Sequence, residues 1–122
     1  MTDFYVVSLK HTRRDAKYIT VWRPEDKGYA WPLSWAGKSS EADILAGRDY
    51  YHRGDDTLAV PCATLDALAV PPIKGTIDGD AGPVVMSNRA NWARILEAAM
   101  PNPIYKPQPQ YRGAPRRTGA AA

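Results

Sequence analysis

The sequence predicts a small α+β domain with an antiparallel sheet of three to four strands, a C-terminal amphipathic helix packed on one face, and an irregular Pro-rich tail. Residues 4–10 and 18–23 are rich in β-branched and aromatic residues, which is typical of strands. Residues 87–100 carry apolar residues three, four and seven apart, which is the spacing of one helix face. Residues 101–122 hold five prolines and no periodicity. We therefore expect one domain over residues 1–100 and a tail over 101–122.

Length and charge limit the classes of partner. The 122 residues, 44% of them hydrophobic, suit one domain with one core. The 16 Lys and Arg exceed the 13 Asp and Glu by three, but the tail alone carries four bases and no acid, so residues 1–100 have 12 bases against 13 acids. A body so close to neutral argues against a broad basic face for duplex DNA or an anionic membrane. Nucleic acid contact is expected only through a local basic loop and the tail.

Cysteine usage and hydropathy predict a soluble, cytoplasmic protein that does not enter the membrane. Cys62 is the single cysteine, so an internal disulfide and the zinc sites built on Cys pairs are excluded. The start MTDFYVVSLKH lacks the pattern of a signal peptide, and no run of about 18 apolar residues occurs. The DGDAG motif at residue 78 resembles the start of a calcium loop but lacks its later Glu, so we expect no metal and no cofactor.

Aromatic residues concentrate in residues 18–38, which hold three of the four tryptophans. Residues 18–23 alternate as a strand, 24–28 form a polar turn that ends in Gly, and 29–33 begin a second strand that Pro32 weakens. Side chains of a strand alternate between faces, so Tyr18, Thr20 and Trp22 share one face of this hairpin. The strand at 4–10 is expected to pair with 18–23 through the loop HTRRDAK, which carries Arg13 and Arg14.

The remaining elements follow from local signals. Ser39 or Ser40 is placed to cap a short helix whose Ile44 and Leu45 would face the sheet. Residues 57–60 (TLAV) predict a buried strand that Pro61 ends or places on an edge, and residues 62–68 (CATLDAL) suit two helical turns. The Gly- and Asp-rich residues 73–83 predict a loop, and Ser87 or Asn88 is expected to cap the helix in which Trp92, Ile95 and Leu96 face the sheet.

The mixture of aromatic and basic side chains predicts a binding surface, because such mixtures stack on bases or anchor in a partner's pocket. The competing interpretation is core packing, and we expect Trp22 or Trp35, together with Trp92, to lie in the core. Tyr29 and Trp31, close to the turn, are the better surface candidates. The candidate binding residues are Arg13, Arg14, Arg23, Tyr29, Trp31, Trp35, Lys38, Tyr50, Tyr51 and Arg53. For Arg13 and Arg14 the alternative interpretation is that their loop is solvated and contacts no partner.

No catalytic residue is predicted. A nucleophilic site would need Cys62 paired with His11 or His52, the two imidazoles of the chain. A lone Cys at the start of a short helix is more often a small core residue. An enzyme dependent on Cys and His is therefore the weakest of the functional interpretations.

The stretches FYVVSLKHT, YITVWRPEDKGYAWPLSWAGK, GDDTLAVPC, DGDAGP and YKPQPQYRGA resemble a family of small uncharacterised proteins encoded by tailed phages and prophages. The resemblance spans nearly the whole chain. The family has no assigned activity, so the resemblance transfers no catalytic residue. Ser39 departs from a pattern in which an aromatic residue more often follows the Lys. The resemblance implies a role in the conflict between phage and host.

Two functions are therefore expected. The first is a non-catalytic accessory protein that counters host defence by binding and inhibiting a host protein or nucleoprotein complex. The alternative is a sponge that sequesters a nucleotide second messenger in a pocket of about 300 Å³ or more. For the tail, we expect Ile104 and Tyr105 to pack on the body and the residues after Gly113 to make few contacts with it.

Overall fold

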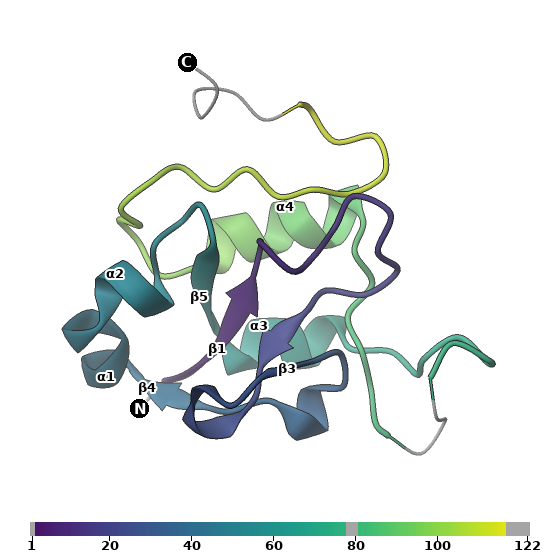
Figure 1. Cartoon of the computed structure of the whole chain (residues 1–122), viewed down its shortest axis with the longest axis horizontal. Coiled ribbons are helices and arrows are strands. Elements are labelled where there is room, and N and C mark those ends of the chain that lie inside the picture. Colours follow the sequence, from purple (N-terminus) through teal and green to yellow (C-terminus); the bar gives the residue numbers. More distant parts are fainter. Residues whose placement is uncertain (1, 78–80, 117–122) are drawn as a thin grey trace.

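The structure, a computed structural model, describes residues 2–77 and 81–116 as an α+β fold with one small antiparallel sheet (Figure 1). The described residues form five strands, four α-helices and two short 3₁₀ helices. The strands are β1 (Asp3–Ser8), β2 (Val21–Trp22), β3 (Tyr29–Ala30), β4 (Ser39–Ser40) and β5 (Thr57–Pro61). The helices are η1 (Pro24–Asp26), η2 (Leu33–Trp35), α1 (Glu41–Ala46), α2 (Arg48–Tyr51), α3 (Cys62–Leu68) and α4 (Arg89–Ala98). The sheet has one strand more than predicted, because the polar pair that forms β4 carries no strand pattern.

Strand β1 lies at the centre of the sheet. One of its edges pairs with β5 along its length, from Phe4 opposite Pro61 to Ser8 opposite Thr57. Its other edge is shared, since Val7 lies opposite Val21 of β2 while Asp3 and Phe4 lie opposite β4. Both faces of β1 are covered by other elements, which explains why its sequence is apolar almost throughout instead of alternating.

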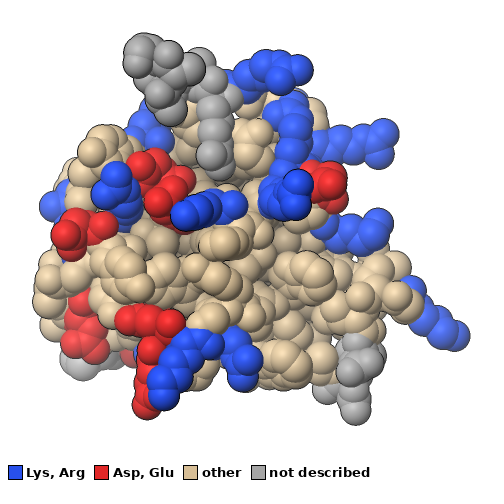
Figure 2. Space-filling model, viewed as in Figure 1, with Lys and Arg blue, Asp and Glu red and all other residues tan. Residues whose placement is uncertain are grey.

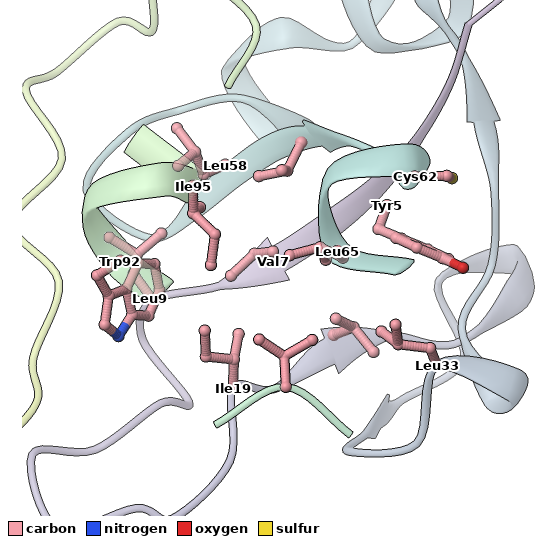
Figure 3. Close-up of a cluster of buried hydrophobic side chains, with 13 residues drawn as sticks. Tyr5, Val7, Leu9, Ile19, Leu33, Leu58, Cys62, Leu65, Trp92 and Ile95 are labelled. Atoms are coloured by element: carbon pink, nitrogen blue, oxygen red, sulfur yellow. The ribbon is translucent and has the colours of Figure 1, made fainter. Parts of the chain in front are cut away.

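Helices α3 and α4 cover the first face of the sheet. Leu65 of α3 and Trp92 and Ile95 of α4 are buried against Val7 and Leu9 (Figure 3). The indole Nε1 of Trp92 donates to Ser87 Oγ at 3.0 Å, so this buried polar group is satisfied. Leu96 does not follow the expectation that it packs on the sheet, because 39% of it is exposed. Where α4 crosses the sheet, Trp92 and Ile95, three residues apart, are the positions that point inward.

Helices α1 and α2 cover the second face, where Phe4 and Val6 meet Ile44 and Met100. Ser40 caps α1, since its Oγ accepts the backbone N–H of Asp43 at 3.1 Å. Ile44 is fully buried as expected, but Leu45 is 52% exposed and faces away from the sheet. A helix of six residues offers only one buried row, so its neighbouring apolar residue remains in solvent.

The aromatic hairpin is shorter than the sequence pattern indicates. Tyr18 and Ile19 pair outside the regular strands: Tyr18 makes an isolated bridge with Met86, and the N–H of Ile19 donates to the carbonyl of Val85. The second strand ends at Ala30, and η2 replaces the expected continuation because Pro32 cannot donate to a ladder. At the base of the hairpin a Cβ on Gly37 would lie 2.8 Å from the Cα of Pro24, so only glycine permits this approach.

Residues 101–116 run back along the body (Figure 1). The side chains of Ile104 and Tyr105 remain about half exposed, at 44% and 50%, although the N–H of Tyr105 donates to the carbonyl of Arg53. Contrary to expectation, Ala114 is buried and its carbonyl accepts Nη2 of Arg14 at 2.6 Å. The same expectation covers residues 117–122, which lie outside the described residues.

Candidate functional site: an aromatic surface on the hairpin

Aromatic rings meet around strands β2 and β3. Trp22 and Tyr29 are opposite each other in the ladder, and their ring centroids are 6.4 Å apart. On the other side, Trp22 contacts Tyr50 and Tyr51 of α2 at 5.0 and 5.8 Å. All three contacts are edge-on, the arrangement that aromatic pairs favour. Helix α2 is thereby joined to the hairpin through ring contacts.

A cavity of about 620 Å³ opens on the hairpin beside this cluster. Its lining residues are His11, Thr20, Tyr29, Ala30, Trp31, Pro32, Trp35, Ile77 and Ala81. Tyr29, Trp31 and Trp35 are 48%, 42% and 49% exposed, so large ring surfaces face solvent here. The volume lies in the range of ligand pockets, about 300–1,000 Å³. Among the described residues that line the cavity there is no Asp, Glu, Lys or Arg.

Two segments distant in sequence form walls of this cavity. Trp31 packs edge-on against Tyr18, whose hydroxyl accepts the backbone N–H of Ile73 at 2.8 Å. On the η2 side, Ser34 Oγ donates to the carbonyl of Ala81 at 2.7 Å. The N–H of Leu33 also donates to the carbonyl of Pro83 at 2.9 Å. The aromatic rings are therefore held against segments that the sheet itself does not contain.

A second cavity of about 280 Å³ adjoins the first and shares His11 and Tyr29 with it. The rings of these two residues pack with their centroids 4.0 Å apart and form the wall between the cavities. The second cavity is more polar, since Lys10, Asp49, Arg53 and Asp56 are among its lining residues. Arg53 Nε also donates to Asp55 Oδ1 at 2.8 Å, so part of its charge is compensated within the chain.

The candidate binding residues fall into four groups. Tyr29, Trp31 and Trp35 line the large cavity, and the guanidinium of Arg23 lies over the Trp35 ring, 5.6 Å from its centroid. Tyr50 and Arg53 line the adjoining cavity. Lys38 lines a third hollow of about 230 Å³ that also includes Asp26, whose carboxylate accepts the hydroxyl of Tyr51 at 2.8 Å. Arg13 is exposed, and Arg14 binds the tail through Ala114 and Gln110.

Sequence reasoning missed several residues that line the large cavity, namely His11, Thr20, Ile77 and Ala81. The sequence identified His11 only as one residue of a basic loop. No local pattern indicated that its ring would pack on Tyr29. Ile77 and Ala81 come from a loop whose partners are more than 40 residues away. Of the tryptophans expected in the core, Trp92 is 1% exposed and Trp22 is half-buried, while Trp35 lies at the surface.

The Cys and His pair required for nucleophilic catalysis does not form. Cys62 is buried in the first core cluster, where burial raises the pKa of its thiol to about 11. His52 is fully buried with both ring nitrogens engaged: Nδ1 accepts the N–H of Ala59 at 3.0 Å and Nε2 donates to the carbonyl of Met100 at 2.7 Å. Burial also lowers the pKa of His52, which keeps it neutral. The other imidazole, His11, packs on Tyr29. This geometry removes the basis of the enzyme interpretation.

Charge is distributed unevenly around these cavities. Residues 10–38 carry seven Lys and Arg against three acids, a net charge of +4. Residues 41–56 carry two Arg against five acids, a net charge of −3. Figure 2 shows an uncharged area across the middle of one face, with charged side chains around its margin. The hairpin region is thus locally basic although the whole body is nearly neutral.

Two other features limit the chemistry of the described part of the chain. Within residues 2–77 and 81–116, no three His, Cys, Asp or Glu side chains gather as they would around a metal ion. Over the same residues, none of the helices has the length and apolar character needed to cross a lipid bilayer.

A scan against protein-family models and searches of curated proteins and of solved structures find no match to this chain.

Proposed function

We propose that this chain is a small phage-type accessory protein that counters host defence in the cytoplasm of a host bacterial cell. In this proposal it acts without catalysis, by binding and inhibiting a host protein or nucleoprotein complex. The observation that supports it best is the set of half-exposed rings of Tyr29, Trp31 and Trp35 around one cavity. Exposed aromatic rings are uncommon on surfaces without a partner and are enriched at the centres of interfaces.

The contact would be centred on the large cavity. Tyr29, Trp31 and Trp35 would become buried on binding, and the charged side chains around them would form the polar rim that interfaces have. Arg23, held over Trp35, adds a cation next to the apolar centre. The proposal also retains α4 as the amphipathic helix of the fold and the Pro-rich residues 101–122 as a tail that supplies a second, basic contact.

A pull-down from bacterial lysate tests this proposal when wild type and a Trp31→Ala, Trp35→Ala double variant are compared. We expect wild type to retain one host protein or complex that the variant loses. A Leu45→Ala variant is the matched control, because Leu45 is equally exposed but lies on α1. If wild type and the double variant retain the same material, the aromatic surface is not the contact and the proposal fails.

A sponge for a nucleotide second messenger is the second candidate. The adjoining cavity favours it, because Lys10 and Arg53 lie within reach of a ligand whose base would occupy the large cavity. Asp49 and Asp56 in the same lining oppose an anionic ligand. Thermal unfolding in the presence of a panel of cyclic and linear nucleotides tests the candidate, and an unchanged melting temperature at millimolar nucleotide would count against it.

A further inference from the structure

We propose that the large cavity takes unpaired bases of a single-stranded nucleic acid. The inference rests on the proposed function, since it identifies the nucleic acid of a host nucleoprotein complex as what the hairpin contacts. Trp31, directly after β3, and Trp35, in η2, line the same cavity. Each ring is nearly half exposed. Stacking on aromatic rings is the main way in which proteins hold unpaired bases.

The remainder of the lining suits a base better than an extended polar ligand. Thr20 and His11 are its main polar side chains besides Tyr29, and Thr20 Oγ1 already donates to the carbonyl of His11 at 3.0 Å. Few groups are therefore left to read a base edge by hydrogen bonds. The cavity is expected to accept different bases with similar affinity, as stacking sites do.

Cations lie next to the cavity and not within it. Arg23 lies over the outer part of the site at Trp35, and Lys10 lines the adjoining cavity. Among the described residues the ion pairs are Lys27 with Glu25 and Arg53 with Asp55. Neither Arg23 nor Lys10 forms an ion pair with a described acid, although Asp49 and Asp56 line the same cavity as Lys10. A phosphate backbone that crosses the cavity would pass close to both cations.

This arrangement favours a single-stranded nucleic acid over two related ligands, duplex DNA and a free nucleotide. Duplex DNA keeps its bases stacked inside and presents phosphates, which would require a broad basic face that the nearly neutral body lacks. A free nucleotide would require its phosphates to be held inside the pocket, but no Lys or Arg is found among the described residues that line the large cavity. A single-stranded nucleic acid fits both the nearly neutral body and the uncharged lining, because its bases can enter the cavity while its phosphates remain at the margin.

Fluorescence anisotropy with labelled 12-nucleotide dT and rU strands tests the inference. We expect saturable binding at 50 mM salt that weakens at least about tenfold at 200 mM, since counterions are released from the phosphates. Trp31→Ala and Trp35→Ala should each weaken binding by about 5- to 150-fold, the range for the loss of one stacked base. Trp35→Phe should restore most of the affinity, because it restores a ring. Arg23→Gln should reduce the dependence on salt.

Leu45→Ala is again the matched control, because Leu45 is an equally exposed apolar residue that lies on α1, away from both cavities. It should bind the strands as wild type does. Absence of saturable binding up to about 100 µM protein at 50 mM salt, or equal binding by Trp35→Ala and wild type, overturns the inference. If the lysate pull-down still retains a protein after nuclease treatment while no strand binds, the proposed function stands and the cavity is a protein contact. If a strand binds but no complex is retained, the inference stands alone.

Discussion

The covered sheet around β1 and the open hairpin of β2 and β3 use the same residue types with opposite exposure. Trp92 is 1% exposed under α4, and its indole N–H is bonded to Ser87. Trp31 and Trp35 are 42% and 49% exposed beside a cavity. The difference arises because α3 and α4 cover one face of β1, whereas α2 packs against Trp22 of the hairpin and leaves Trp31 and Trp35 exposed. A large aromatic residue therefore stabilises the fold in the first region and remains available for contact in the second.

The same contrast recurs for other residue types. His52 is buried and hydrogen-bonded, whereas His11 is exposed. Gly54 lies against the tail, whereas Gly75 has open space around it. Arg14 binds the tail, whereas Arg13 is exposed. Each pair offers a matched experiment, in which a change in the covered member should affect the fold more than the same change in the open member.

The largest effect is expected at Trp92. Trp92→Ala should lower the free energy of unfolding by about 3–5 kcal/mol, because a fully buried ring leaves a cavity between Leu9 and Ile95. Trp35→Ala should change it by less than about 1 kcal/mol. Urea unfolding followed by circular dichroism measures both. Equal losses for the two variants would contradict the division into covered and open regions.

The second-largest loss of stability is expected at Gly54, because both its backbone conformation and the space around it require glycine. Its φ is +99°, and a Cβ there would lie 1.8 Å from the carbonyl oxygen of Tyr105. Gly54→Ala should destabilise the fold by about 1–3 kcal/mol more than Gly75→Ala, whose φ of +87° is similar but whose Cβ would have no neighbour within 4 Å. Trypsin should also cut the Gly54→Ala protein faster at Arg112. Equal melting temperatures for the two variants would show that the tail does not pack on Gly54.

His52 should make the fold sensitive to mild acid. Burial, and to a smaller extent Arg48, lower the pKa of His52 in the folded state, while hydrogen bonds to the backbone partly oppose them. The unfolded chain therefore binds a proton at a higher pH than the folded chain does. Stability is fully present above the unfolded pKa of about 6.5 and is lost as the pH falls below it, with a slope of at most about 1.4 kcal/mol per pH unit.

Urea unfolding between pH 7.5 and 5 measures this slope. His52→Gln should flatten it, whereas His11→Gln, at the exposed ring on Tyr29, should leave it in place. A stability that does not change over this range in wild type would contradict the buried, neutral state of His52.

The smallest effect is expected at Arg14. Its guanidinium donates to the carbonyl of Ala114 and to Oε1 of Gln110, at 2.6 and 3.3 Å. Arg14→Ala should lower stability by about 0.5–1.5 kcal/mol and increase trypsin cleavage at Arg112, because the end of the tail loses its anchor. Arg13→Ala should do neither. If Arg13→Ala has the larger effect, the tail is held by other contacts.

The sequence was a good guide wherever a short segment carries its own signal. The helix at residues 62–68, the cap by Ser40 and the strand that ends at Pro61 were predicted with nearly the observed bounds. These features depend on hydrogen bonds and backbone restrictions within a few residues. The sequence was a poor guide to which apolar residues of a helix are covered, as Leu45 and Leu96 show, because coverage depends on the angle at which a helix crosses its neighbours.

By itself, the sequence determined that this chain forms an α+β fold and that its aromatic residues concentrate in one hairpin, since composition and alternation are properties of neighbouring residues. Only the tertiary structure decided which of those rings are covered. Trp22 is half-buried against α2, while Trp35 remains exposed because η2 turns away at Pro32 and the loop at Ala81 forms a wall of the cavity. It also decided that both ring nitrogens of His52 are engaged by the backbone of Ala59 and Met100, while Cys62 is buried in the first core cluster. Contacts between segments tens of residues apart leave no local pattern, so they exist only once the chain has folded.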